Sequence, residues 1–269
     1  MKLREAIKIL ADAGVENPHY DARELFVRIG GLSLTELLTS DASCNDAKLT
    51  AAIERRKNRE PLQYIIGNID FYRENYTVSP DCLIPRQDTE ILVDFAVRSI
   101  PPGEKFLDLC TGSGCIAVST LKNTEDTVAV AVDISEKALA LARLNAEKNG
   151  VSERVSFVLG DALSFSPNGK FYAILSNPPY VDEAVYNQLE PEIYFEPKIA
   201  FTADDSGLEF YKKILLEYKE SLDPRGFFAF EIGFDQGASL VSLAKEHEMM
   251  CEIIKDYSGN DRVAVIRAQ

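Results

Sequence analysis

Residues 105–121 decide the fold of this chain and read Lys105-Phe106-Leu107-Asp108-Leu109-Cys110-Thr111-Gly112-Ser113-Gly114-Cys115-Ile116-Ala117-Val118-Ser119-Thr120-Leu121. The first six residues are typical of a short buried strand, and those from Cys115 onward are typical of a helix. Between them, Thr111-Gly112-Ser113-Gly114 predicts a tight loop whose glycines let the backbone approach a ligand closely. The next strand, 127–132, ends in Asp133, an acidic residue placed to accept hydrogen bonds from both hydroxyls of a ribose.

The same loop discriminates among cofactors. A phosphate-binding loop would continue with Lys-Ser or Lys-Thr where Cys115 stands, and a dinucleotide fingerprint prefers a third glycine where Ala117 stands. Asp108, beneath the loop, suits a cofactor with a cationic, amino-acid-like end, because a carboxylate would repel a pyrophosphate. S-adenosylmethionine has this character. A third strand, 155–159, leads into Gly160-Asp161, and this carboxylate is either an acceptor for an adenine amino group or an ordinary loop residue.

A second motif, Asn177-Pro178-Pro179-Tyr180, follows the apolar run 171–175 and Ser176. Two prolines fix φ and lack N–H groups, so the strand stops in a stiff turn with Asn177 at its carboxyl end. Ligands bind at such ends in open α/β sheets. The turn offers carbonyl oxygens that accept from a planar NH₂ group and a Tyr180 ring that stacks on it, although an Asn-Pro pair alone also marks an ordinary turn.

These motifs together resemble a class I S-adenosylmethionine-dependent methyltransferase, and the wider chain is similar to the release-factor glutamine methyltransferases. The segments 59–67, 83–90, 196–197, 207–211, 231–233 and 261–263 resemble blocks of that family. The resemblance implies a seven-stranded, mostly parallel Rossmann-like sheet and a cofactor site that includes Cys110, Ala162 and Asn177. The family usually has glycine where Cys110 stands and often an aromatic residue where Ala162 stands.

Composition predicts a globular protein of the cytoplasm. The chain of 269 residues is 46% hydrophobic, suits one large and one smaller domain, and has no apolar run of membrane-spanning length and no signal sequence. Five scattered cysteines and two distant histidines predict neither a disulfide framework nor a metal site. The net charge of −14 argues against a nucleic-acid partner and favours a protein substrate with a basic surface. The basic cluster 55–59 is interpreted as a solvated helix end, with a docking patch as the alternative.

The organisation expected is a helical substrate-docking domain (1–58), a linker with a β-hairpin (59–84) and a methyltransferase domain (85–269). Hydrophobic spacing and caps predict helices near 3–13, 18–29, from Ser33 with a capping box, and 46–57. Alternation predicts the hairpin around Arg73-Glu74-Asn75, and Asp88 is expected to cap a helix that runs to Ser99. Strands and helices then alternate, and the tail 226–266 offers strands that include an antiparallel closing hairpin. The aperiodic stretch 181–207 is expected to carry part of the substrate surface.

The family resemblance supplies the substrate, the glutamine of the Gly-Gly-Gln loop in peptide-chain release factors, and a monomeric enzyme is expected. In the hypothesis, the side-chain oxygen of Asn177 and the carbonyl of Pro178 accept the two N–H bonds of the glutamine amide. Pro179 and Tyr180 pack on the amide plane, so the gain is orientation and electrostatics rather than a strong base. Two alternatives stay open: a DNA or RNA amino-methyltransferase, which needs a flipped base, and a non-catalytic cofactor-binding scaffold.

Overall fold

The computed structural model describes residues 1–38 and 42–268 and divides into two compact units. Unit 1 comprises Met1–Asn68 and Glu190–Phe195, and unit 2 comprises Ile69–Leu189 and Glu196–Gln269. No helix in the described ranges has the length and apolar character that crossing a membrane requires. The functional division at residues 58 and 84 stays a prediction, because the two units are defined by compactness alone.

Unit 1 is a small helical bundle around a core to which Leu10, Phe26 and Ile53 contribute. The capping box expected at Ser33 is confirmed: the N–H of Glu36 donates to Ser33 Oγ at 3.3 Å, and the N–H of Ser33 donates to the Glu36 carboxylate at 2.8 Å. A fifth helix follows Pro61 because Leu62 and Ile65 pack into the same core. The helices are α1 (Leu3–Asp12), α2 (Pro18–Arg28), α3 (Leu34–Leu37), α4 (Ala47–Lys57) and α5 (Leu62–Ile66).

The basic cluster at the end of α4 is only partly solvated, which corrects the interpretation from sequence. The Arg56 side chain is 8% exposed, and it donates to Asp21 at 2.6 Å and to Glu192 at 2.9 Å. Arg59 donates to the same Glu192 at 2.6 Å. These ion pairs explain why the short segment around the 3₁₀ helix η2 (Pro191–Phe195) belongs to unit 1, although Glu192 is 133 residues from Arg59 and 136 from Arg56 in the chain.

Unit 2 contains the seven-stranded sheet that the sequence predicts, in the order β5-β4-β3-β6-β7-β9-β8. The first five strands in this order are parallel, and β9 runs antiparallel to both β7 and β8, so the closing hairpin is confirmed. The strands are β3 (Lys105–Leu109), β4 (Val128–Asp133), β5 (Val155–Leu159), β6 (Phe171–Ser176), β7 (Leu222–Glu231), β8 (Met249–Lys255) and β9 (Asp261–Ala268). A separate hairpin joins β1 (Asn68–Phe71) and β2 (Glu74–Thr77).

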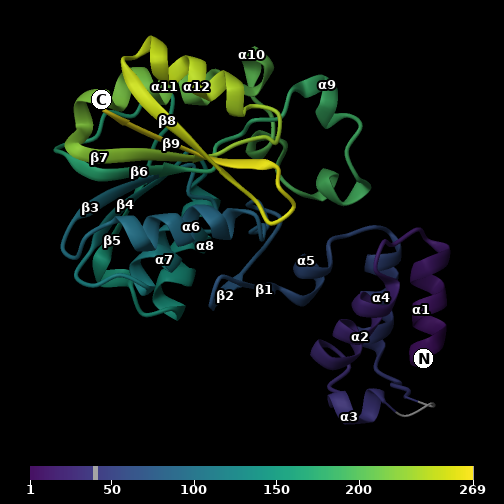
Figure 1. The fold of residues 1–269 in the computed structure, drawn as a ribbon. Helices are drawn as coiled ribbons and strands as arrows, with labels where there is room; N and C mark the ends of the chain where they lie inside the picture. Colours follow the sequence, from purple (N-terminus) through teal and green to yellow (C-terminus); the bar gives the residue numbers. More distant parts are fainter. Residues whose placement is uncertain (39–41, 269) are drawn as a thin grey trace. The chain divides into compact units, whose positions relative to one another are not determined.

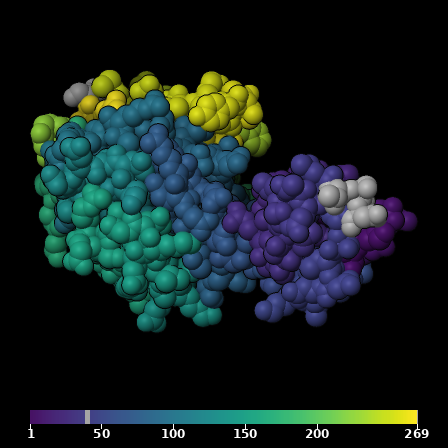
Figure 2. All heavy atoms as spheres, turned by 90° about the horizontal axis from the view of Figure 1, so that it is seen from below, coloured from purple at the N-terminus to yellow at the C-terminus, as the bar shows by residue number. Residues whose placement is uncertain are grey.

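Helices cover both faces of this sheet (Figure 1). One face packs against α6 (Thr89–Ser99), α7 (Cys115–Lys122) and α8 (Glu136–Lys148), whose atoms, coloured blue to teal, make up much of unit 2 in Figure 2. The other face packs against α11 (Glu209–Tyr218) and α12 (Gly237–Glu246). Side chains alternate between the two cores as the pleat requires, with Phe106 and Phe227 on the first side and Leu107 and Phe228 on the second.

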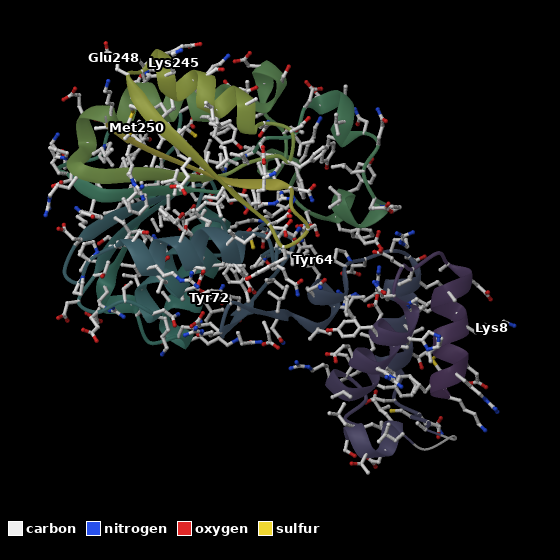
Figure 3. The ribbon with its side chains drawn as sticks, viewed as in Figure 1. Lys8, Tyr64, Tyr72, Lys245, Glu248 and Met250 are labelled. Atoms are coloured by element: carbon white, nitrogen blue, oxygen red, sulfur yellow. The ribbon has the colours of Figure 1, made fainter. Side chains whose placement is uncertain are left out.

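Two local expectations are wrong. The hairpin turns at Tyr72-Arg73, with Tyr72 at φ +57° (labelled in Figure 3), rather than at Arg73-Glu74-Asn75. Glu74 instead begins β2 because its carboxylate is buried and accepts from Ser119 at 2.8 Å and Asn123 at 3.0 Å. Asp88 precedes α6 but does not cap it through its side chain, because the carboxylate pairs with Arg262 at 3.2 Å.

The stretch 181–207 is less irregular than its sequence suggests. It contains the short helices α9 (Glu183–Tyr186), η2, η3 (Lys198–Ala200) and α10 (Asp204–Gly207). Inside α10, Asp205, Ser206 and Gly207 all have positive φ, so this turn is left-handed. Its part in the substrate surface stays a prediction. The remaining 3₁₀ turns are η1 (Ser152–Arg154) and η4 (Lys219–Ser221).

Candidate active site

A cavity of about 370 Å³ opens in unit 2 at the carboxyl ends of the parallel strands. Each of four neighbouring strands brings a residue that the sequence singled out: Cys110 and Gly112 follow β3, Asp133 ends β4, Asp161 follows β5 and Asn177 follows β6. Ala162 also lines the cavity. Further walls come from Asp81-Cys82-Leu83 and from residues between Pro197 and Phe210. Parallel strands end at one edge of a sheet, and this brings residues distant in sequence to one site.

The charged side chains that line this cavity are all carboxylates. They are Asp81, Asp133, Asp161, Glu183, Asp204 and Glu209, and the described residues contribute no lysine, arginine or histidine to the lining. Such a lining attracts a cation and repels phosphate. Among the described residues, no group of three or more His, Cys, Asp or Glu side chains is placed to hold a metal ion.

The two glycines of the loop have different structural roles. Gly112 lines the cavity with φ +54°, and its N–H donates to Asp133 Oδ2 at 2.8 Å. The second oxygen of Asp133 accepts from the N–H of Ser135 at 2.8 Å, so this carboxylate fixes the loop. Gly114 does not line the cavity. A Cβ on it would lie 3.1 Å from the Cβ of Ala142, so glycine here permits α8 to pack closely against the loop.

Asp108 lies beneath the loop, and the loop residues Thr111 and Ser113 are buried rather than in the cavity wall. The Oδ2 atom of Asp108 accepts from Thr111 Oγ1 at 2.5 Å and from the N–H of Ala117 at 3.2 Å. Its Oδ1 atom is buried and has no hydrogen-bond partner among the described residues. Burial raises the pKa of this carboxyl to about 7. An unsatisfied buried acceptor beneath the loop fits a cofactor with a positive charge nearby.

Cys110 occupies a backbone conformation that favours glycine, with φ +59°. This geometry costs a residue with a Cβ about 1 kcal/mol or more, which fits the glycine that the family resemblance leads us to expect at this position. The thiol is partly exposed at the cavity wall, and burial of the surrounding site raises its pKa. Cys110 is one of five cysteines that are all free thiols.

The Asn-Pro-Pro-Tyr turn contributes Asn177 and Pro179 to the cavity wall, whereas Pro178 and Tyr180 lie behind it. Asn177 Nδ2 donates to Thr89 Oγ1 at 3.3 Å, so the side-chain oxygen of Asn177 is the atom that can accept a hydrogen bond from a ligand. The Tyr180 hydroxyl donates to Glu231 Oε1 at 3.3 Å, and the Tyr180 carbonyl accepts from Gln236 Nε2 at 3.3 Å. The stacking expected of Tyr180 therefore stays a prediction, since its hydroxyl points to a buried carboxylate.

Sequence reasoning missed Thr89, Glu231 and Gln236, three buried polar residues that hold this turn. A signal for Glu231 was present, because it ends an apolar strand as Asp133 does. Gly207 was also missed as a packing position: a Cβ on it would lie 2.0 Å from the carbonyl oxygen of Tyr180. Its glycine permits the left-handed turn of α10 to rest on the Asn-Pro-Pro-Tyr backbone.

Comparison with known proteins finds similar sequences and a similar fold. Residues 2–67 match a family described as PrmC N-terminal domain, and residues 87–193 match the Methyltransferase small domain. The chain is 36% identical to a release factor glutamine methyltransferase of Nitratidesulfovibrio vulgaris over 98% of this chain and 93% of the relative. It is also 36% identical to one of Geobacter sulfurreducens, over 94% and 91%. The fold resembles that of a methyltransferase from Pyrococcus furiosus, with a TM-score of 0.54 and 21% identity over 71% of this chain and 86% of the other.

Proposed function

The chain belongs to the release factor glutamine methyltransferase family, and we propose that it methylates the side-chain amide nitrogen of the Gly-Gly-Gln glutamine in peptide-chain release factors. S-adenosylmethionine, when bound, supplies the methyl group from its sulfonium. The observation that carries this proposal is the Asn177 amide at the wall of an acidic cavity, with its donor engaged by Thr89 and its oxygen left to accept. An acceptor of this kind suits an NH₂-bearing substrate.

The residues present fit the proposed cofactor. Its sulfonium and ammonium charges match a cavity whose charged lining is entirely acidic. Asp133, at the end of β4, has lone pairs left for ribose hydroxyls after accepting from Gly112 and Ser135. Asp161 accepts from the N–H of Leu163 with one oxygen and has the other for an amino group. We assign Gly112, Cys110 and Ala162 to the cavity wall around it.

The chain acts on the acceptor chiefly by orientation. An amide nitrogen is a poor nucleophile because its lone pair is delocalised into the carbonyl. In the proposal, Asn177 Oδ1 accepts one N–H bond at the cavity wall and turns the lone pair toward the methyl group. The carbonyl of Pro178 is the expected second acceptor, but Pro178 does not line the cavity, so this contact stays a prediction. Neither His19 nor His247 lines the cavity, and no histidine base is assigned. Correct placement of two reacting groups supplies up to about 7–11 kcal/mol in favourable cases.

We further propose that the enzyme works as a monomer in the cytoplasm, where translation takes place, without direct contact to nucleic acid. Residues 1–68 contain ten acidic and ten basic residues, and unit 1 also includes Glu190 and Glu192, so −12 of the net charge of −14 belongs to unit 2, which carries the cavity. A surface of this sign disfavours a phosphate backbone and favours a protein partner with a basic surface.

The test is transfer of a radiolabelled methyl group to purified release factor, with a factor that carries Gln→Ala in its Gly-Gly-Gln loop as the substrate control. We expect label on the natural factor alone. Asn177→Ala should reduce transfer by about 100-fold or more while cofactor binding stays measurable, since it removes a hydrogen-bond acceptor at the reacting group. Asn168→Ala is the matched control, because Asn168 is exposed and precedes β6, at the opposite end of the strand from Asn177. Undiminished turnover by Asn177→Ala would contradict the assignment.

A further inference from the structure

A buried carboxylate holds both ends of the Asn-Pro-Pro-Tyr turn. Glu231 is 2% exposed, ends β7 and does not line the cavity. Its Oε2 atom accepts from the hydroxyl of Thr89 at 2.5 Å, and its Oε1 atom accepts from the hydroxyl of Tyr180 at 3.3 Å. The register explains the proximity: Ser176 of β6 pairs with Phe230 of β7, so Asn177 and Glu231 are the next residues on neighbouring strands. A buried charge in this position requires hydrogen bonds, and it receives two.

The hydrogen bonds that link Asn177, Thr89 and Glu231 all run in one direction, from donor to acceptor. A threonine hydroxyl has one proton, and Thr89 donates it to Glu231. The Thr89 oxygen can therefore only accept a hydrogen bond from Asn177, and Asn177 Nδ2 donates to it at 3.3 Å. If the Asn177 amide were reversed, its oxygen would face the lone pairs of Thr89 and gain no hydrogen bond. The chain Glu231–Thr89–Asn177 thus selects one of two amide orientations that are almost identical in shape.

We propose that Thr89 and Glu231 are positioning residues that keep the Asn177 oxygen, rather than its NH₂ group, presented to the acceptor amide of the substrate. This inference rests on the proposed function and adds two residues to it. In the selected orientation an oxygen meets the N–H bonds of the substrate. In the reversed orientation two donors face each other, the substrate loses its acceptor, and transfer fails although the cavity is intact.

Thr89→Val and Thr89→Ser separate this role from simple packing. Valine keeps the shape of threonine but removes the hydroxyl, so Nδ2 of Asn177 loses its acceptor and the reversed amide becomes at least as favourable. Serine keeps the hydroxyl. We expect Thr89→Val to lower kcat about tenfold or more, with the Kd for S-adenosylmethionine changed less than twofold, and Thr89→Ser to retain most of the kcat.

Glu231→Met gives the sharper comparison, because it removes the acceptor of the Thr89 proton. The hydroxyl then turns to Asn177 Oδ1 and holds the amide in the reversed orientation. The kcat should fall further than in Thr89→Val. Adding Thr89→Val to Glu231→Met removes that proton, so the double variant should be more active than Glu231→Met alone. Losses of packing would accumulate instead, so this reversal of sign is specific to the orientation model.

The experiment measures methyl transfer to the release factor, cofactor binding by calorimetry and thermal stability for the full-length wild type and all four variants. An inactive wild type would overturn the proposed function, and the inference with it. An active wild type with equal kcat in Thr89→Val and Thr89→Ser would overturn the inference alone. A double variant less active than Glu231→Met would overturn it as well. If Glu231→Met does not fold, the two Thr89 variants decide the question.

Discussion

Asp108 allows the strongest test of how a buried carboxyl beneath the loop affects stability and cofactor binding. Its carboxyl is fully buried, with one oxygen bonded to Thr111 and Ala117 and the other without a partner among the described residues. Burial raises its pKa from 3.8 to about 7, and at about 1.36 kcal/mol per pKa unit the ionised form destabilises the fold by up to about 4 kcal/mol. Asp108→Asn replaces this group by an amide of the same shape that does not ionise.

The direction of the pH effect follows from proton binding. Between pH 3.8 and about 7 the folded protein keeps a proton on Asp108 that the unfolded chain has released, so stability falls as the pH rises through this window. Above pH 7 the folded form ionises too and the loss levels off. Between pH 5 and pH 8 this residue alone should lower the free energy of unfolding of the wild type by about 2.5 kcal/mol. Asp108→Asn should not show this component.

The assay is urea unfolding at pH 5, 6.5 and 8 without cofactor, followed by far-UV circular dichroism because the chain has no tryptophan. The useful quantity is the difference between wild type and Asp108→Asn, since other buried carboxyls such as Glu231 and Asp133 also have raised pKa values in both proteins. At pH 8 we expect the variant to be the more stable protein and to bind S-adenosylmethionine more weakly, because it lacks the charge that attracts the cation. Parallel stability curves for the two proteins across this pH range would refute the reasoning.

Two further substitutions, each with a matched control, test a close backbone contact and a buried ion pair. Gly207→Ala should reduce methyl transfer about tenfold or more, because a Cβ at this position would lie 2.0 Å from the carbonyl oxygen of Tyr180. The control is Gly169→Ala, since Gly169 also has a positive φ but a Cβ there would meet open space. Similar activity of the two variants would contradict the contact as the cause. Arg56→Met should destabilise unit 1 by about 3–5 kcal/mol, since it leaves the buried Asp21 without its partner and leaves Glu192 with Arg59 alone. Arg55→Met breaks a more exposed pair and should cost about 1 kcal/mol or less. Thermal unfolding by circular dichroism compares the two variants, and equal shifts in Tm would contradict this assignment.

Much of the fold follows from local sequence patterns. Apolar runs such as 105–109 and 171–176 form strands that are buried on both faces, and the alternation of strands with helices predicts a parallel sheet. The same rule places Asp133 and Asn177 at one edge, and both line the cavity. These residues could be predicted because the position of a side chain at a strand end depends on the strand itself and little on the rest of the chain.

Other features depend on contacts that no local pattern contains. Thr89 and Glu231 are 142 residues apart, and only the register of neighbouring strands and the start of α6 brings them together. The two loop glycines read alike in sequence, yet Gly112 faces the cavity and Gly114 faces Ala142 of α8. Glu192 lies in an aperiodic stretch, and its place in unit 1 is set by Arg56 and Arg59 of a distant segment.

The site separates two tasks that carboxylates perform. Those in the cavity wall, such as Asp133 and Asp161, attract a cation directly. Glu231 stays behind the wall and acts through the neutral Thr89 and Asn177. A carboxylate in the place of Asn177 would also accept from an NH₂ group, and both of its oxygens would accept equally well. An amide is neutral, but only one of its two orientations presents an oxygen. The buried Glu231 therefore sets the orientation of the Asn177 amide, which a carboxylate at position 177 would not need, and it does so without placing a charge at the reacting centre.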